Sequence, residues 1–160
     1  MREKALDPQS SDLDAIASAL NQLIQVCKDG ESGFRTSAEA VKDENLRRLF
    51  QSYSQQRAEF TSELQLEVRR LARDPVDAGH ATAAVHRAWM DLKGRMTGTD
   101  DAAVVAEAER GEDVAVKAYE EVLKRDLPSD IRTLVERQLL EIRQAHDHVR
   151  SLEQAHARRR

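Results

Sequence analysis

The chain has 160 residues and a mass of 18.1 kDa, which is enough for one domain with a single hydrophobic core. Charged residues make up 34% of the sequence, whereas glycine (6) and proline (3) are scarce, so little of the chain is suited to turns. The aromatic residues, three Phe, two Tyr and one Trp, are too few for a typical β-sandwich or barrel. This composition predicts an all-α protein built from long helices.

Charge and cysteine content exclude several classes of function. The formal net charge of −4 argues against a general nucleic-acid binder, and the basic tip at 157–160 is interpreted as a frayed end. Cys27 is the only cysteine, so an intramolecular disulfide is impossible and a cysteine-based zinc site is disfavoured. The sequence shows neither a signal peptide nor an apolar run of ~18 residues, so we expect a cytoplasmic protein with no membrane span.

The first half of the chain predicts a helical hairpin. Residues 1–9 are expected to be disordered, and residues 10–156 are expected to form one four-helix-bundle domain. An amphipathic pattern predicts a first helix at 10–42, and Asp43 is predicted to cap a second helix at 44–73. Because the connection between them is so short, the two helices are expected to be antiparallel.

The second half of the chain predicts another hairpin. A short helix is predicted at 81–95, with Trp89 as the anchor that pins it to the bundle. A third long helix is predicted at 100–125, because Thr99-Asp100-Asp101 offers a cap and an acidic first turn. A fourth is predicted to run from Pro128 to about residue 155. The connection between the second and third long helices is long, so the second hairpin can pack beside the first in either sense, including a crossover bundle.

An internal repeat relates the two hairpins. Gly30-Glu31 in the first helix and Gly111-Glu112 in the third long helix lie 81 positions apart, which indicates that the hairpins are diverged copies. A glycine inside a helix costs about 0.5–1 kcal/mol relative to alanine, so two matched glycines indicate close helix packing or a local bulge. We expect both glycines where these two helices cross. Their glutamate neighbours are expected to be buried and hydrogen-bonded to Gln, Tyr or His on the other two long helices.

Each of the four long helices is predicted to direct polar side chains toward the bundle axis at a comparable level. Carboxylates and imidazole groups on facing helices are the ligands with which such bundles bind iron or manganese. The candidate metal ligands are Glu31, Glu63, Glu112, Glu141 and His148. The other polar side chains expected on these inward faces are Tyr53, Gln56 and Gln138.

Five blocks of the sequence carry a family likeness: Leu20–Ile24, Lys28–Phe34, Gln56–Phe60, His86–Lys93 and Glu109–Glu121. The chain resembles the ferritin-like superfamily and, more narrowly, a group of uncharacterised bacterial four-helix-bundle proteins of unknown function, over residues 13–153. The resemblance implies a ferritin-like four-helix bundle, here with a short extra helix between helices two and three. It also implies a homo-oligomer, since ferritin-like bundles commonly dimerise, but it brings no established activity.

The pattern of a metal site is incomplete in this chain. Carboxylate-bridged di-iron bundles use a Glu-x-x-His pair on two helices, but none of Glu59, Glu63 and Glu141 is followed by histidine three residues later. The leading hypothesis is therefore a non-enzymatic bundle without a cofactor that associates through a helix face, as a dimer or with a protein partner. The alternative is a metal-binding oxidoreductase or metal-storage protein with a degenerate di-metal site. No phosphate-binding loop, Cys–His pair or Gly-x-Ser-x-Gly motif points to another enzyme class.

Overall fold

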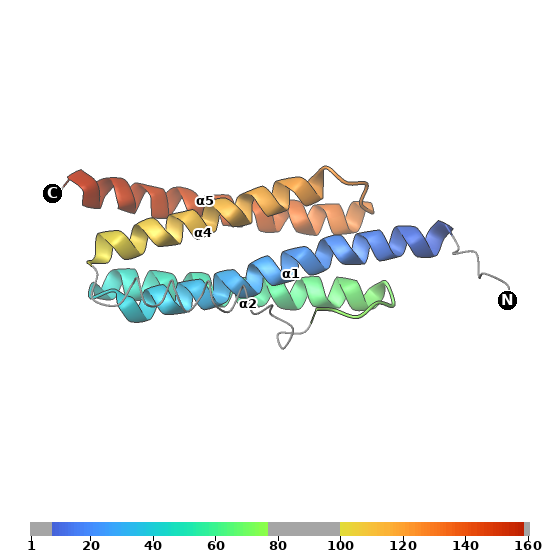
Figure 1. Cartoon of the computed structure of the whole chain (residues 1–160), viewed down its shortest axis with the longest axis horizontal. Coiled ribbons are helices and arrows are strands. Elements are labelled where there is room, and N and C mark those ends of the chain that lie inside the picture. The colour runs from blue at the N-terminus through green and yellow to red at the C-terminus, as the bar shows by residue number, and fades with distance from the viewer. Residues whose placement is uncertain (1–7, 77–99, 159–160) are drawn as a thin grey trace, which may run out of the picture.

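The computed structural model describes residues 8–76 and 100–158, and most of these residues are helical. The helices are α1 (Pro8–Ala40), α2 (Glu44–Arg70), α4 (Asp101–Leu123) and α5 (Ser129–Arg158), as Figure 1 shows. These two ranges contain no strand, which confirms the predicted all-α class with four long helices. The short helix predicted at 81–95, with Trp89, lies outside the described residues, as do residues 1–7 and 159–160.

The helices begin where the sequence places their caps. The Asp43 side chain accepts a hydrogen bond from the backbone N of Leu46 at 3.0 Å, and the Asp100 side chain accepts one from the backbone N of Ala103 at 3.0 Å. The observed bounds differ from the predicted ones by only a few residues, since α1 begins at residue 8 rather than 10 and α2 ends at residue 70 rather than 73. Such differences are usual at helix ends.

The four helices form an elongated bundle with a crossover. α1 packs against α2 and α4, and α5 packs against α4 and α2, so α1 lies diagonal to α5 and α2 lies diagonal to α4. Within each hairpin the helices are antiparallel, whereas α2 and α4 run in the same direction (Figure 1). Asp101, at the start of α4, accepts hydrogen bonds from the backbone N of Lys42 (2.8 Å) and of Asp43 (2.9 Å), beside the start of α2. The end of α2 and the start of α4 therefore lie at opposite ends of the bundle, which is the crossover arrangement.

The described part of this connection lies against α1. Ala72 has a positive φ of 55° and turns the chain at the end of α2. The backbone N of Val76 then donates to Oδ1 of Asn21 at 2.9 Å, and Lys28 Nζ donates to the carbonyl oxygen of Val76 at 3.1 Å. The connection thus starts along the outer side of α1, away from α5.

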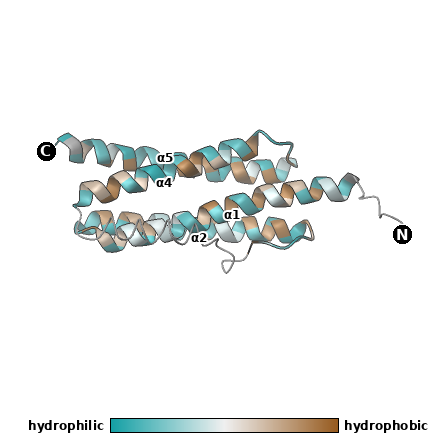
Figure 2. Ribbon diagram, in the orientation of Figure 1, coloured by the Kyte–Doolittle hydropathy of each residue, from teal (hydrophilic) through white to brown (hydrophobic). Residues whose placement is uncertain are grey.

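The hydrophobic core is divided into two clusters. Figure 2 shows apolar and polar residues alternating along each helix, as expected for helices with one apolar side. On α2 one cluster ends at Phe50 and the other begins at Phe60, and on α4 one ends at Ala108 and the other begins at Ala115. Arg57 on α2 and Glu112 on α4 are buried between these two clusters.

Candidate functional site

A buried ion pair occupies the centre of the bundle. Nη2 of Arg57 on α2 donates to Oε2 of Glu112 on α4 at 2.7 Å, and the two side chains are only 1% and 2% exposed. Because α2 and α4 are diagonal, this pair crosses the bundle axis. It lies at the level that separates the two apolar clusters, so the Arg57–Glu112 pair fills the position where an inward-facing polar site was expected.

Arg57 is held by packing as well as by its charge. Its guanidinium lies over the Phe34 ring, 5.3 Å from the ring centroid, which is within the range of a cation–π contact. Burial raises the pKa of Glu112, and the neighbouring Arg57 guanidinium opposes this rise. A charge pair this deeply buried is maintained only while both partners are present, because either charge alone would be desolvated without compensation.

Gly30 makes room for Arg57. A Cβ atom at Gly30 would lie 3.3 Å from Nη1 and 3.4 Å from Cγ of Arg57, which is tighter than ordinary side-chain contact. Next to it, Ser54 Oγ donates to the carbonyl oxygen of Glu31 at 2.9 Å, so α1 and α2 approach closely here. The glycine therefore serves the α1–α2 contact, and through it the buried ion pair.

The predicted symmetry of the two glycines is wrong. Gly30 faces α2 rather than α4, and a Cβ atom at Gly111 would meet nothing within 4 Å because Gly111 faces solvent. Glu31, expected to be buried, is partly exposed and pairs with Arg35 at 2.8 Å one turn along α1. Glu112 is buried as predicted, but its partner is an arginine rather than Gln, Tyr or His.

A second buried polar group lies beside the ion pair. The Cys27 thiol and the Tyr119 hydroxyl are 3.0 Å apart, and Tyr119 donates to Oε1 of Gln138 at 2.8 Å. Gln138, predicted to point inward, is fully buried, and its amide donates to the carbonyl oxygen of Phe60 at 3.5 Å. Burial raises the pKa of Cys27 to about 11 and that of Tyr119 well above its usual value, so both groups are protonated and unreactive near neutral pH.

The buried polar side chains of the described bundle are all hydrogen-bonded. Every buried side-chain nitrogen or oxygen in residues 8–76 and 100–158 has a partner. These groups therefore stabilise one another inside the bundle, as is usual for buried polar groups.

The predicted metal ligands do not converge in the structure. Glu63 and Glu141 both pair with Arg137 at the partly exposed α2–α5 boundary. His148 is exposed, and its Nδ1 lies 2.9 Å from the Tyr53 hydroxyl. Glu31 and Glu112 are held by Arg35 and Arg57, as described above. Among the described residues, no group of three His, Cys, Asp or Glu side chains is close enough to hold a metal ion. Metal binding by Glu31, Glu63, Glu112, Glu141 and His148 stays a prediction.

The spacing Glu-x-x-His occurs once in the chain, outside the set of predicted metal ligands. Glu153 and His156 lie in the last turns of α5, far from the central level of the bundle. His156 Nδ1 lies 2.8 Å from the carbonyl oxygen of Leu152, so this ring nitrogen is occupied within its own helix. The pair therefore does not complete a central site.

The central arginine is the residue that sequence reasoning missed. Gln56 was expected on the inward face of α2, but Gln56 is partly exposed and Arg57 is fully buried. The signal was present, because Arg57 lies seven residues from both Phe50 and Leu64, which are core residues of the same helix. A charged residue at that spacing indicates a buried partner of opposite charge.

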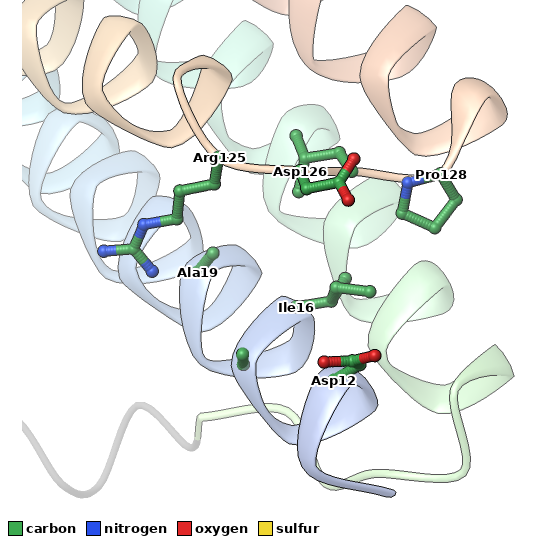
Figure 3. A pocket seen from close by; sticks show the side chains of 8 residues that line it. Asp12, Ile16, Ala19, Arg125, Asp126 and Pro128 are labelled. Carbon is green, nitrogen blue, oxygen red and sulfur yellow. The ribbon is translucent and has the colours of Figure 1, made fainter. Parts of the chain in front are cut away.

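An open notch at one end of the bundle is the other candidate site. Figure 3 shows Arg125 projecting from the α4–α5 turn toward α1, with Asp126 and Pro128 beside it and Asp12 on the far side. The notch has a volume of about 490 Å³. Its floor is apolar, its charged groups are Asp12, Arg125 and Asp126, and its lining contains no histidine or cysteine. Its lining residues are Asp12, Ala15, Ile16, Ala19, Arg125, Asp126, Leu127 and Pro128.

The fold defines the class of protein: a ferritin-like four-helix bundle, with two antiparallel hairpins joined by a crossover. A similar solved structure is a two-domain protein from Anabaena variabilis containing DJ-1/ThiJ/PfpI-like and ferritin-like domains. The TM-score is 0.73 at 13% sequence identity, and the match covers 98% of this chain and 46% of that one. The chain thus spans about half the length of that protein.

The sequence also identifies the family. Residues 15–125 match the family described as Domain of unknown function (DUF2383), and the chain belongs to this family. The match extends from α1 through α4 and ends before α5. The comparison with curated proteins finds no match. None of the described helices is both long and apolar enough to cross a membrane.

Proposed function

We propose that this chain is a non-catalytic ferritin-like bundle that acts by association through a helix face, either with a second copy of itself or with a protein partner. The observation that supports this proposal most is the Arg57–Glu112 pair. It places a fixed cation at the centre of the bundle, where a metal-dependent relative of this fold would need open carboxylate ligands. With its interior engaged in this way, the protein is left with its outer surface for function.

Exposed apolar side chains are available for such association. Leu66 on α2, Val114 on α4 and Leu140 on α5 are 48%, 63% and 58% exposed. Single exposed apolar residues are ordinary on protein surfaces, so each is a candidate contact only together with its surroundings.

We also propose that the protein is cytoplasmic. Because its net charge is −4, we propose that its partner is not a nucleic acid.

The alternative function, binding of iron or manganese, keeps one favourable feature, the Glu112 carboxylate buried at the bundle centre. The two functions are separated by elemental analysis of protein purified without a metal-binding tag from cells grown in iron-supplemented medium. We expect less than about a tenth of an equivalent of iron, manganese or zinc per chain, because stable binding needs several preformed ligands. A near-stoichiometric metal content that is lost in Glu112→Gln would replace the proposal with the metal-binding function.

Association itself is tested by light scattering across a wide range of protein concentrations. A dimer, or a stable complex with a protein recovered from the native host and reconstituted from purified components, supports the proposal. A chain that stays monomeric at the highest concentration and forms no reconstituted complex contradicts it.

A further inference from the structure

We propose that the groove between α4 and α5 is the interface of a symmetric dimer of this chain. This inference rests on the proposed function and names the face and the partner for it. The groove has a volume of about 490 Å³ and lies on the outer side of the second hairpin. It is lined by Glu120, Leu123, Lys124, Glu136, Leu139, Leu140 and Arg143.

The centre of the groove is apolar. Leu123 is partly buried and Leu139 is buried, and both line the groove beside Leu140, which is 58% exposed. Leu140 therefore extends an existing apolar surface outward, whereas Leu66 and Val114 do not line this groove. An apolar centre with a large side chain standing out of it is the usual anatomy of the middle of a protein interface.

The rim of the groove is complementary in charge to itself. Two acidic residues, Glu120 and Glu136, and two basic residues, Lys124 and Arg143, surround the leucines. In a dimer with twofold symmetry, a residue i away from the axis contacts a residue j of the other copy, and j contacts i in return. A surface that carries both signs of charge can therefore form opposite-charge pairs with a second copy of itself. The groove satisfies this condition.

Glu136 is the rim residue that most needs a partner. Glu120 pairs with Arg143 at 2.9 Å and Lys124 pairs with Glu121 at 2.7 Å. Glu136 is exposed and forms no ion pair with another of the described residues. We assign Lys124 of a second copy as its partner, since Lys124 is 71% exposed and its present ion pair with Glu121 is a surface pair that stabilises the fold little.

The notch at the end of the bundle fits a second copy less well. Its rim carries Asp12 and Asp126 against a single Arg125, so two copies of the notch would bring an excess of like charge together. The described part of the α2–α4 connection lies against α1, which is diagonal to α5, so it leaves α5 clear. Of these two surfaces, the α4–α5 groove is the one whose charges suit contact with a second copy.

The first experiment measures the dimer dissociation constant by sedimentation or light scattering for the full chain and for Leu140→Glu. Burying this added charge should weaken the dimer by about 30-fold or more, as expected for a central interface residue. Leu66→Glu and Val114→Glu are matched controls on other surfaces and should leave the constant unchanged. Circular dichroism checks that all variants remain helical.

The second experiment tests the pairing of Lys124 with Glu136 of the other copy. Lys124→Glu and Glu136→Lys should each be monomeric alone, because a symmetric dimer of either variant places like charges together twice. Mixed in equal amounts, the two variants should form a heterodimer, since both contacts then join opposite charges. This result would not follow from an effect within one chain.

The outcomes separate this inference from the proposed function. A wild-type dimer that Leu140→Glu and the charge variants leave intact would overturn the assigned face while preserving self-association. A wild-type chain that is monomeric at all concentrations would overturn the dimer, and the proposed function would then depend on the reconstituted complex with a protein partner.

Discussion

The buried Arg57–Glu112 pair makes a quantitative prediction about stability. The two side chains are 1% and 2% exposed, so solvent does not screen either charge once its partner is removed. Replacing Arg57 by Met or Glu112 by Leu should each lower the free energy of unfolding by about 3–5 kcal/mol. Small domains are stable by only about 5–15 kcal/mol, so these are large fractions of the total. The Met side chain keeps the aliphatic contact of Arg57 beside Gly30 but loses the contact of the guanidinium with Phe34.

The double variant Arg57→Met/Glu112→Leu should behave differently from the sum of the single changes. With both charges gone, the centre of the bundle becomes apolar and continuous with the two core clusters. We expect a stability within ~1 kcal/mol of the natural protein or above it, because an apolar replacement avoids the desolvation of two ions. Urea denaturation of the four proteins gives the coupling energy from the thermodynamic cycle.

The exposed pair Arg110–Glu107 on α4 provides the control for this cycle. Its atoms are 2.8 Å apart, but the Arg110 side chain is 71% exposed. The equivalent Met and Leu replacements should therefore show a coupling of less than about 0.5 kcal/mol. If the buried and exposed pairs give the same small coupling, the reasoning from burial is refuted.

The pH dependence of Arg57→Met offers an independent check. Burial raises the pKa of Glu112 in the folded protein, so keeping the carboxylate ionised costs stability at neutral pH. This stability is regained as the pH falls through the raised pKa, because the carboxyl group then takes up a proton. Loss of Arg57 removes the opposing cation and raises this pKa further. The gain in stability between about pH 7 and pH 5 should thus be larger in Arg57→Met than in the natural protein, and smaller in the double variant. Equal slopes would show that Glu112 is not desolvated.

Other predictions are checked by melting temperature. Gly30→Leu should destabilise the fold by about 1–3 kcal/mol, because the new side chain overpacks against the buried arginine. Gly111→Ala should stabilise it by about 0.5–1 kcal/mol, because Gly111 is exposed in a helix. A rise in melting temperature for both variants would show that Gly30 faces solvent. Burial lowers the pKa of His146, but hydrogen bonds to Asp113 and Asp147 outweigh it and raise this pKa above its usual value. The stability lost in His146→Gln should therefore be greatest below about pH 6.5 and should disappear as the pH rises through the pKa of His146 in the folded protein. A loss of stability that does not depend on pH would contradict this prediction. Ala72→Gly should stabilise by up to about 1 kcal/mol because of the positive φ, and a loss would count against that backbone geometry.

Local sequence signals were sufficient for the helices. The cap at Asp43, the cap signal in 99–101 and the spacing of apolar residues predict the positions of α1, α2, α4 and α5 to within a few residues. These signals are local because a helix satisfies its hydrogen bonds within the segment itself. The direction of the second hairpin was left open, since it depends on contacts such as that of Asp101 with the α1–α2 turn, which join residues about 60 positions apart.

The candidate site was predicted only in part. The spacing of residues along a helix shows which side chains face inward, but it does not show which polar side chains contact each other across the bundle. Glu112 and Gln138 were correctly expected inside, but their partners on other helices depend on rotations of a fraction of a helical turn. On α2 such a rotation exposes Gln56 in part and buries Arg57. Glu112, predicted as a metal ligand, therefore forms an ion pair with this buried guanidinium.

If the two hairpins are compared in the register of the predicted repeat, only one of them carries this buried charge. In the register that matches α2 with α5, at an offset of 85, Arg57 corresponds to Ile142, which is fully buried. Glu31, the counterpart of Glu112, therefore has no guanidinium at the equivalent position and lies at the surface beside Arg35. The glycines follow the same logic, since Gly30 is needed where an arginine passes and Gly111 has nothing to accommodate. The difference between Arg57 and Ile142 thus goes with the different environments of the two Gly-Glu pairs, since Glu112 is buried and Glu31 is partly exposed. The bundle therefore has one buried ion pair instead of a symmetric pair of ligand sets.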